Sequence, residues 1–197
     1  MFLARVGRMV FWIVALTVAP ALPASAQQVE EMLGVPGPIG FQGTEFALAW
    51  SSRPFPNYFK QEYVPAGERP EHFTQMFMIE ADTRASPEAA VSAQVDMLKQ
   101  RKGSDPVVNY ALIRNDATGE IILDFLMSDS SSGETIVEWN AYRYAPLTGN
   151  GGVALYAISR RGYGDGARDF LKNLKQTRPP AIDALAAFDA PKLTPAP

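Results

Sequence analysis

The sequence predicts an α+β fold in which an antiparallel β-sheet is packed by two main α-helices. Seven short segments show the apolar and polar alternation, or the richness in β-branched and aromatic residues, that is typical of strands. A segment between the third and the fourth of them carries a full set of helix signals. Short polar links join the last four strand segments, which favours antiparallel neighbours. The predicted order is therefore βββ-α-ββββ-α.

The first three predicted strands precede the helix and cover residues 46–51, 58–64 and 73–80. In the first of them, Phe46, Leu48 and Trp50 alternate with smaller residues, as expected of a half-buried strand. We expect Trp50 and Phe59 to be core residues. The preceding stretch, residues 34–43, is rich in Gly and Pro and predicts an irregular lead-in.

The best-defined helix is predicted to begin at Pro87. Ser86 is a preferred N-cap residue, and proline is favoured at the first helical position. Apolar residues recur at i, i+4 and i+7 and form one face: Val91, Val95 and Leu98. Basic residues crowd the last turn, where the helix dipole favours cations, and Gly103 can close the end.

Four more strands are predicted after this helix, at residues 107–114, 121–127, 136–144 and 153–160. A second helix is predicted after Asp165, with one apolar stripe made of Ala167, Phe170, Leu171 and Leu174. We expect Pro179 and Pro180 to end it, because proline lacks the backbone donor that a helix interior needs. The Pro-rich tail, residues 191–197, is predicted to be disordered.

Residues 1–26 predict a cleavable secretory signal. Arg5 and Arg8 give a positive start, an uncharged apolar run follows, and Ala24-Ser25-Ala26 supplies the small residues that signal peptidase requires. The apolar run is shorter than the ~20 residues of a membrane-spanning helix. We therefore expect cleavage after Ala26, a single domain over residues 27–190 without an integral membrane segment, and a periplasmic or secreted location.

Composition limits the classes of function. The 197 residues include 18 Lys and Arg, 21 Asp and Glu and no cysteine, with a formal net charge of −3. The lack of cysteine excludes thiol catalysis, disulfides and a cysteine-linked lipid anchor. An acidic chain without a basic stripe is a poor candidate for binding nucleic acid. A single histidine argues against a zinc site, and we expect no cofactor.

The predicted order of elements resembles that of the Mog1/PsbP/DcrB-like group, in which a sheet lies between two helices. The resemblance covers most of the chain after residue 26 and rests on element order and spacing. It implies a binding or accessory role, because most members of that group are non-enzymatic. An NTF2-like cone is the alternative fold, but such a fold usually begins with helices, whereas this chain begins with strands.

Three residues are candidates for chemistry. His72 is the only histidine and could act as a base or a metal ligand, although a solvated loop histidine is the ordinary outcome in so polar a segment. Arg160 and Arg161 precede a glycine-rich turn before the second helix, where they could hold a carboxylate or a phosphate. Turn formation alone also explains those glycines. A dinucleotide site would need a following parallel strand, which the sequence does not predict.

The turn around Phe55 is the candidate interaction surface. It contains Arg53, Phe55 and Tyr58, and proline stands on both sides of Phe55. Aromatic residues and arginine dominate protein interfaces. A phenylalanine between two prolines is difficult to bury, so we expect Phe55 to be exposed.

These observations favour a non-enzymatic accessory or binding protein of the cell envelope, with another envelope protein as its partner. Two alternatives stay open: a hydrolase or lyase that uses His72 or the Arg160–Arg161 pair, and an immunity-type inhibitor. A concave pocket that unites His72 with carboxylates, or that contains both arginines, would favour the enzyme. An exposed aromatic patch without convergent polar groups would favour the binding protein.

The mature protein is predicted to begin at Gln27, directly after the small-residue site. Intact-mass analysis of the protein recovered from the envelope of expressing cells measures this directly. Recovery of the full-length chain in that fraction would contradict cleavage after Ala26.

Overall fold

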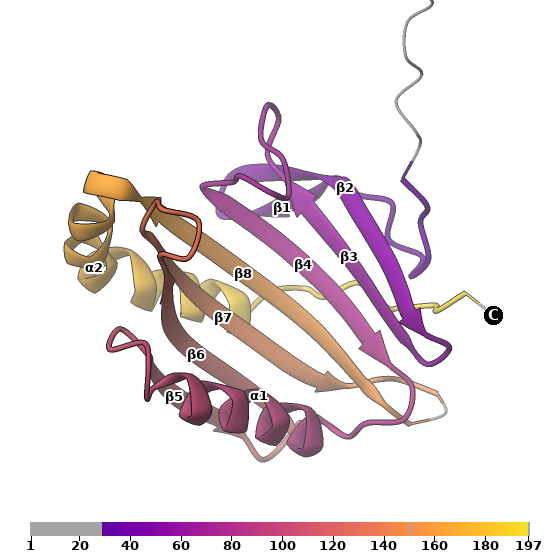
Figure 1. Ribbon diagram of the computed structural model, residues 1–197. Coiled ribbons are helices and arrows are strands. Elements are labelled where there is room, and N and C mark those ends of the chain that lie inside the picture. The colour runs from indigo at the N-terminus through magenta and orange to yellow at the C-terminus, as the bar shows by residue number, and fades with distance from the viewer. Residues whose placement is uncertain (1–28, 150, 197) are drawn as a thin grey trace, which may run out of the picture.

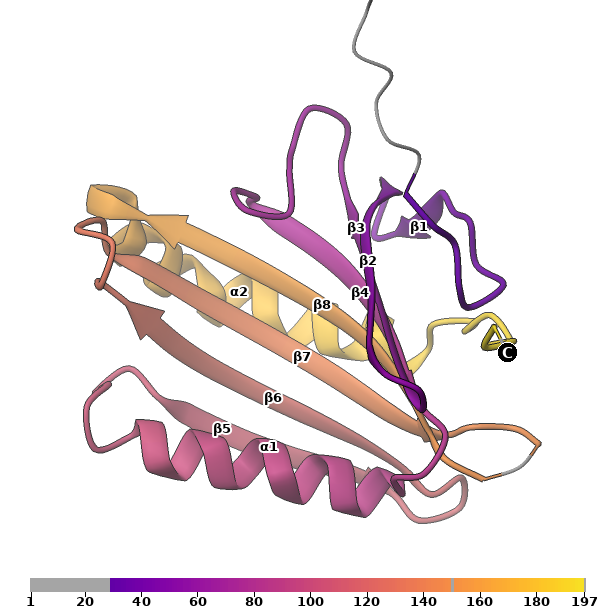
Figure 2. The same ribbon diagram turned by 45° about the vertical axis from the view of Figure 1, so that its right-hand side comes forward.

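The computed structural model describes residues 29–149 and 151–196, and the predicted secretory signal lies outside these residues. They form an eight-stranded antiparallel sheet with one long helix on each face (Figures 1 and 2). The strands are β1 (Ile39–Phe41), β2 (Thr44–Phe55), β3 (Tyr58–Val64), β4 (Gln75–Asp82), β5 (Asn109–Asn115), β6 (Glu120–Asp129), β7 (Ile136–Pro146) and β8 (Val153–Tyr163). The helices are α1 (Pro87–Arg101) and α2 (Ala167–Ala186), the second preceded by a 3-10 turn at Gly164–Gly166. The α+β class is confirmed.

The sheet consists of two meanders that meet in its middle. The spatial order of its strands is β1-β2-β3-β4-β8-β7-β6-β5, and the two halves join where β4 pairs with β8. The segment that contains α1 carries the chain from β4 to β5, at the far edge of the sheet. The sheet is curled, so that β2, β3 and β4 stand as a wall beside the other strands (Figure 2).

The structure adds one strand to the predicted order. Ile39–Phe41, within the stretch that we expected to be irregular, pairs with the start of β2. Gln42 and Gly43 make the turn between them, and both have positive φ, 47° and 79°. Two-residue turns with this backbone match the twist of a β-hairpin. The glycine-rich composition therefore marks a tight hairpin here.

The N-cap and the apolar face predicted for α1 are confirmed. The Ser86 side chain accepts a hydrogen bond from the backbone N–H of Ala89, at 3.2 Å, as an N-cap residue does. The predicted apolar face is buried: Val91, Val95 and Leu98. It packs on β5, β6, β7 and β8, where Leu123 and Phe125 belong to the same cluster.

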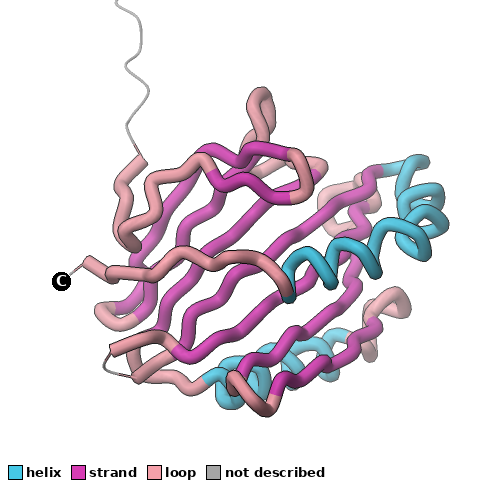
Figure 3. The backbone as a smooth tube through the Cα atoms, turned by 180° about the vertical axis from the view of Figure 1, so that it is seen from behind, coloured by secondary structure: helices cyan, strands magenta, loops and turns pink. Residues whose placement is uncertain are grey.

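α2 covers the opposite face of the sheet and is longer than predicted (Figure 3). The expectation that Pro179 and Pro180 end it is wrong, because the helix continues through both residues. Each proline removes one backbone donor, and the helix changes direction along its length (Figure 3). Ala181 and Leu185 lie beyond the prolines and are fully buried. Their packing on the sheet offsets the lost hydrogen bonds.

Two arginines tie α2 to the sheet. Arg178 of α2 donates from Nε, at 2.8 Å, and from Nη2 to the buried carboxylate of Asp124 on β6. The same carboxylate accepts a hydrogen bond from the Trp139 indole N–H, at 2.7 Å. Arg143 of β7 donates to the carbonyl oxygen of Leu185, in the last turn of α2, at 3.1 Å, and to that of Phe188, just beyond the helix, at 2.8 Å. A cationic donor at a helix C-terminus is favourable, because the carbonyls there point out of the helix.

The tail, which we expected to be disordered, is ordered as far as Ala196. The Thr194 N–H donates to the carbonyl oxygen of Leu33, at 2.8 Å. The Ala196 N–H donates to that of Met32, also at 2.8 Å. Leu193 is buried in the same core as the lead-in. Backbone pairing and this buried leucine hold the tail in place, which its proline content did not indicate.

Trp50 is not the core residue that we expected. It is 40% exposed, whereas Phe59 is fully buried. Trp50 pairs with Glu62 and lies on the α1 side of the sheet, near Lys60. α1 packs against β5 to β8 and leaves this part of β2 uncovered.

Replacing Arg178 with Met is expected to lower the free energy of unfolding by about 3 kcal/mol, the cost of leaving a buried carboxylate without its partner. Urea denaturation measures the change. Lys175→Met, at an exposed position of the same helix, is the control and should change stability by less than about 0.5 kcal/mol.

The double variant that also carries Asp124→Asn should recover part of the loss, because no buried charge then remains. Equal stabilities of Arg178→Met and Lys175→Met would show that this ion pair does not hold α2.

Candidate functional site

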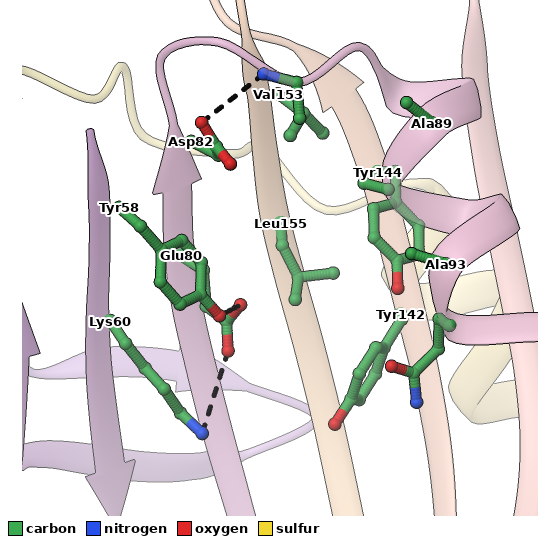
Figure 4. Close-up of a pocket in the computed structure, with 13 residues that line it drawn as sticks. Tyr58, Lys60, Glu80, Asp82, Ala89, Ala93, Tyr142, Tyr144, Val153 and Leu155 are labelled. Atoms are coloured by element: carbon green, nitrogen blue, oxygen red, sulfur yellow. Dashed lines mark hydrogen bonds and ion pairs between the residues drawn. The ribbon is translucent and has the colours of Figure 1, made fainter. Parts of the chain in front are cut away.

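A cavity of about 470 Å³ lies between α1 and the sheet, over the seam where β4 pairs with β8 (Figure 4). Cavities of about 300 to 1,000 Å³ are typical of small-molecule sites. The polar side chains on its walls are Tyr58, Lys60, Glu80, Asp82, Gln94, Tyr142 and Tyr144. They come from β3, β4, α1 and β7, so segments far apart in the sequence build the site.

The register of the strands brings these side chains together. Successive side chains of a strand point to opposite faces, so Lys60 faces the cavity while Phe59 lies in the core beneath α2. Lys60 pairs with Glu80 across β3 and β4. Glu80 pairs with Leu155 of β8, and Leu155 pairs with Tyr144 of β7. One lateral row of side chains therefore crosses the seam.

α1 presents its smallest side chains to the cavity. Ala89 and Ala93 are four residues apart and lie on one helix face, and Ala90 lies beside them. Longer side chains at these positions would fill the space that the methyl groups leave open. On the sheet, Val153 and Leu155 add apolar surface. The cavity thus has apolar surface on two sides.

Glu80 is the central charged group of the site. The Tyr58 hydroxyl donates a hydrogen bond to its Oε2, and Lys60 Nζ lies 3.7 Å from its Oε1 (Figure 4). Burial raises the pKa of Glu80 above its ordinary value, and this effect exceeds the opposing influence of Tyr58 and Lys60. Buried carboxyl groups with raised pKa values are typical of functional sites.

Three tyrosine hydroxyls face this region, from Tyr58, Tyr142 and Tyr144. Burial raises the pKa of each phenol, and nearby carboxylates add to the effect: Glu80 at Tyr58 and Tyr144, and Glu138 and Glu80 at Tyr142. All three therefore keep their protons at neutral pH. Within residues 29–149 and 151–196, the hydroxyls of Tyr142 and Tyr144 have no hydrogen-bond partner. Both hydroxyls can therefore bond to a ligand or to water.

Asp82 has a structural role at the rim of the cavity. Its Oδ1 accepts hydrogen bonds from the Asn57 amide, at 2.8 Å, and from the Arg84 backbone N–H, at 2.9 Å. These bonds fix the turn that follows β4. Of the two carboxylates on the cavity walls, Asp82 therefore serves the turn, whereas Glu80 makes no hydrogen bond to it.

The structure does not bring Arg160 and Arg161 together. Adjacent residues of a strand point to opposite faces, and both lie on β8. The Arg160 guanidinium lies over the Trp139 ring, at 5.6 Å, on the α2 side. Arg161 is paired with Glu138, at 2.5 Å, on the other side. The two guanidinium groups cannot hold one anion between them.

His72 lies outside the cavity, in the loop between β3 and β4. It is exposed, and its ring stacks on Tyr163 with the centroids 4.4 Å apart. The Tyr163 hydroxyl accepts a hydrogen bond from the Phe73 N–H and donates one to the Phe73 carbonyl oxygen. This arrangement fixes the loop against β8 and offers the imidazole no carboxylate partner among the described residues.

The three residues of the predicted interaction surface lie in different surroundings. Phe55 is 64% exposed at the tip of the β2–β3 hairpin. The Arg53 guanidinium lies over the Phe59 ring, at 4.6 Å, toward the α2 side. Tyr58 lines the cavity on the α1 side. Of all the residues singled out from the sequence, Tyr58 alone belongs to the cavity.

Two signals in the sequence could have drawn attention to other cavity residues. Glu80 is a charge directly after the apolar run at residues 76–79, and Ala89 and Ala93 leave a stripe of small residues on a surface helix. Neither signal identifies a site by itself, because these residues are brought together with Tyr142 and Tyr144 only when β4 pairs with β8.

The described part of the chain contains no group of three His, Asp or Glu side chains placed to hold a metal ion. Neither α1 nor α2 is long and apolar enough to cross a membrane.

Together, these features define an α+β protein with a ligand-sized cavity between its first helix and its sheet. The chain belongs to a protein family whose sequence model matches residues 33–190, a range that contains every described strand and helix and the whole cavity lining. No curated protein matches the chain in a sequence comparison.

Glu80→Gln is expected to stabilise the protein as the pH rises above about 4.5, the ordinary pKa of a glutamate. The folded state keeps the Glu80 proton to a higher pH than the unfolded state does, so wild-type stability falls between the two pKa values. Glutamine has no proton to lose and escapes this loss. Thermal unfolding measured from about pH 4 to pH 8 tests the expectation.

Glu45→Gln, at an exposed position of β2, is the matched control for removing one negative charge. The difference in stability between Glu45→Gln and the wild type should not grow in the same way as the pH rises. A Glu80→Gln variant that is less stable than the wild type at neutral pH would contradict burial as the main influence on Glu80.

Proposed function

We propose that this chain is an exported binding protein that holds a small amphipathic organic molecule in the cavity between α1 and the sheet. The observation that supports this most is the composition of the cavity walls. Alanine, valine and leucine side chains lie beside the hydroxyls of Tyr142 and Tyr144 and the half-buried carboxyl group of Glu80. Apolar surface with a few convergent polar groups is the usual composition of a small-molecule site.

The export part of this proposal rests on residues 1–26, whose charge, apolar run and small-residue site are those of a secretory signal. A chain exported by such a signal would act in the periplasm or outside the cell. The arrangement of one helix on each face of an antiparallel sheet supports the likeness to the Mog1/PsbP/DcrB-like group. An accessory role without catalysis is the function that this likeness implies.

We also propose that another envelope protein contacts the β2–β3 hairpin. Phe55 is the large apolar side chain with the greatest exposure among the described residues, and a lone exposed aromatic residue at a hairpin tip suits a contact with a partner. The partner would then contact this protein next to β3, the strand that contributes Tyr58 and Lys60 to the cavity.

The placement of the sequence candidates gives no support to a hydrolase or lyase built on them. The cavity contains neither His72 nor the Arg160–Arg161 pair. Inhibition of a toxin by an immunity-type mechanism has no feature in its favour beyond those that support a binding protein.

Ala93→Phe is expected to weaken the binding of an uncharged apolar probe, such as N-phenylnaphthylamine, about tenfold, because the phenyl ring would occupy the space beside α1. Probe fluorescence measured against protein concentration gives the affinity. Ser92→Phe, at the adjacent exposed position that does not line the cavity, is the matched control and should bind like the wild type.

Circular dichroism of both variants shows whether the fold is retained. Equal binding by Ala93→Phe and Ser92→Phe would place the probe elsewhere on the protein, and no binding by the wild type would remove the support for a cavity ligand.

A further inference from the structure

Carboxylates outnumber cations on the β3–β4 side of the cavity. Lys60 Nζ lies 3.0 Å from Glu62 and 3.7 Å from Glu80. One ammonium group is therefore shared by two carboxylates and is closer to Glu62, which does not line the cavity. The charge of Glu80 is balanced only in part by its neighbours.

Glu80 also has unused hydrogen-bond capacity. An ionised carboxylate offers about four acceptor positions. Among the described residues, the Tyr58 hydroxyl is the group that donates a hydrogen bond to it, since Lys60 at 3.7 Å is beyond hydrogen-bond range. A carboxylate withdrawn from water gains more from a further charged donor than an exposed one does.

The opposite wall offers groups that suit a cation. The rings of Tyr142 and Tyr144 have centroids 6.3 Å apart and are tilted by 59° to each other. They lie across Leu155 from Glu80 (Figure 4). The faces of aromatic rings attract cations, and phenol oxygens accept hydrogen bonds. Lys60 is the one basic side chain among the residues that line the cavity.

We propose that the ligand of this cavity is an organic cation, a protonated amine carried on an apolar body. Its ammonium group donates hydrogen bonds to Glu80 and lies among the rings of Tyr58, Tyr142 and Tyr144. Its apolar body lies along Ala89 and Ala93 of α1. This inference rests on the proposed binding function and adds the charge of the ligand to it.

The charges of the site disfavour an anionic ligand. An anion would have to approach the carboxylates of Glu80 and Asp82, and Lys60, the one cation available to it, is already bound to Glu62. The repulsion between an anion and these carboxylates is strong in a partly desolvated site, and the attraction of one shared ammonium group does not offset it. A neutral alcohol can still bond to the phenol hydroxyls, so it is the ligand class against which the amine must be compared.

The test compares two probes of the same shape, naphthylmethylamine and naphthylmethanol, by fluorescence anisotropy with the purified protein at neutral pH. The amine is protonated at this pH and the alcohol is neutral. We expect the amine to bind at least about tenfold more tightly, because it adds a charge-assisted hydrogen bond to the half-buried carboxylate of Glu80. This comparison uses the wild-type chain and does not depend on how a variant folds.

Glu80→Gln should reduce the ratio of the two affinities to about one, because glutamine is uncharged. Glu45→Gln, which removes an exposed charge of β2, should leave the ratio at its wild-type value. Circular dichroism confirms that both variants are folded, and a ratio that stays high in folded Glu80→Gln would overturn the role of this residue.

The remaining outcomes separate this inference from the function on which it rests. Equal binding of amine and alcohol by the wild type, or tighter binding of the alcohol, would overturn the inference that the ligand is a cation. The cavity would then be a site for neutral molecules. Failure of both probes and of the uncharged apolar probe would overturn the binding function itself.

Discussion

The pairing of β4 with β8 is the constraint on which the rest of the structure depends. It joins residues 75–82 to residues 153–160 in continuous antiparallel register and makes one sheet out of two separate meanders. Without it, the strands before α1 and those after it would be independent four-stranded sheets, each with an unpaired edge. The join also places β3 and β4 beside β7 and β8, the strands on which both helices pack.

The cavity exists because of the same pairing. Tyr58, Lys60 and Glu80 come from one meander, and Tyr142 and Tyr144 come from the other. Each set alone would be a row of polar groups on an exposed strand face. Once the strands are joined, the two sets lie on the walls of one cavity, on either side of Leu155. Polar groups that converge in this way on a partly apolar cavity are typical of a binding site.

Local signals predicted the elements well, because they act over a few residues. The cap at Ser86, the apolar face of α1 and the polar hairpin links all have their causes within one turn or one loop. The site could not be predicted in this way, since Glu80 and Tyr144 become neighbours only through the seam. The failure at Pro179 has a similar cause: the contact of Arg178 with Asp124 and the buried residues beyond the prolines outweigh a local preference.

The backbone pairing of Met32 with Ala196 puts the two ends of the described chain side by side. They lie on the α2 side of the sheet (Figure 3). The cavity lies on the α1 side. A fluorescent protein, a surface tether or a peptide linker attached at either end would thus leave the mouth of the cavity clear. Because the two described ends are close together, the chain is also suited to circular permutation. A short linker could join these ends, and the new chain ends could be placed in the exposed loop at residues 130–133.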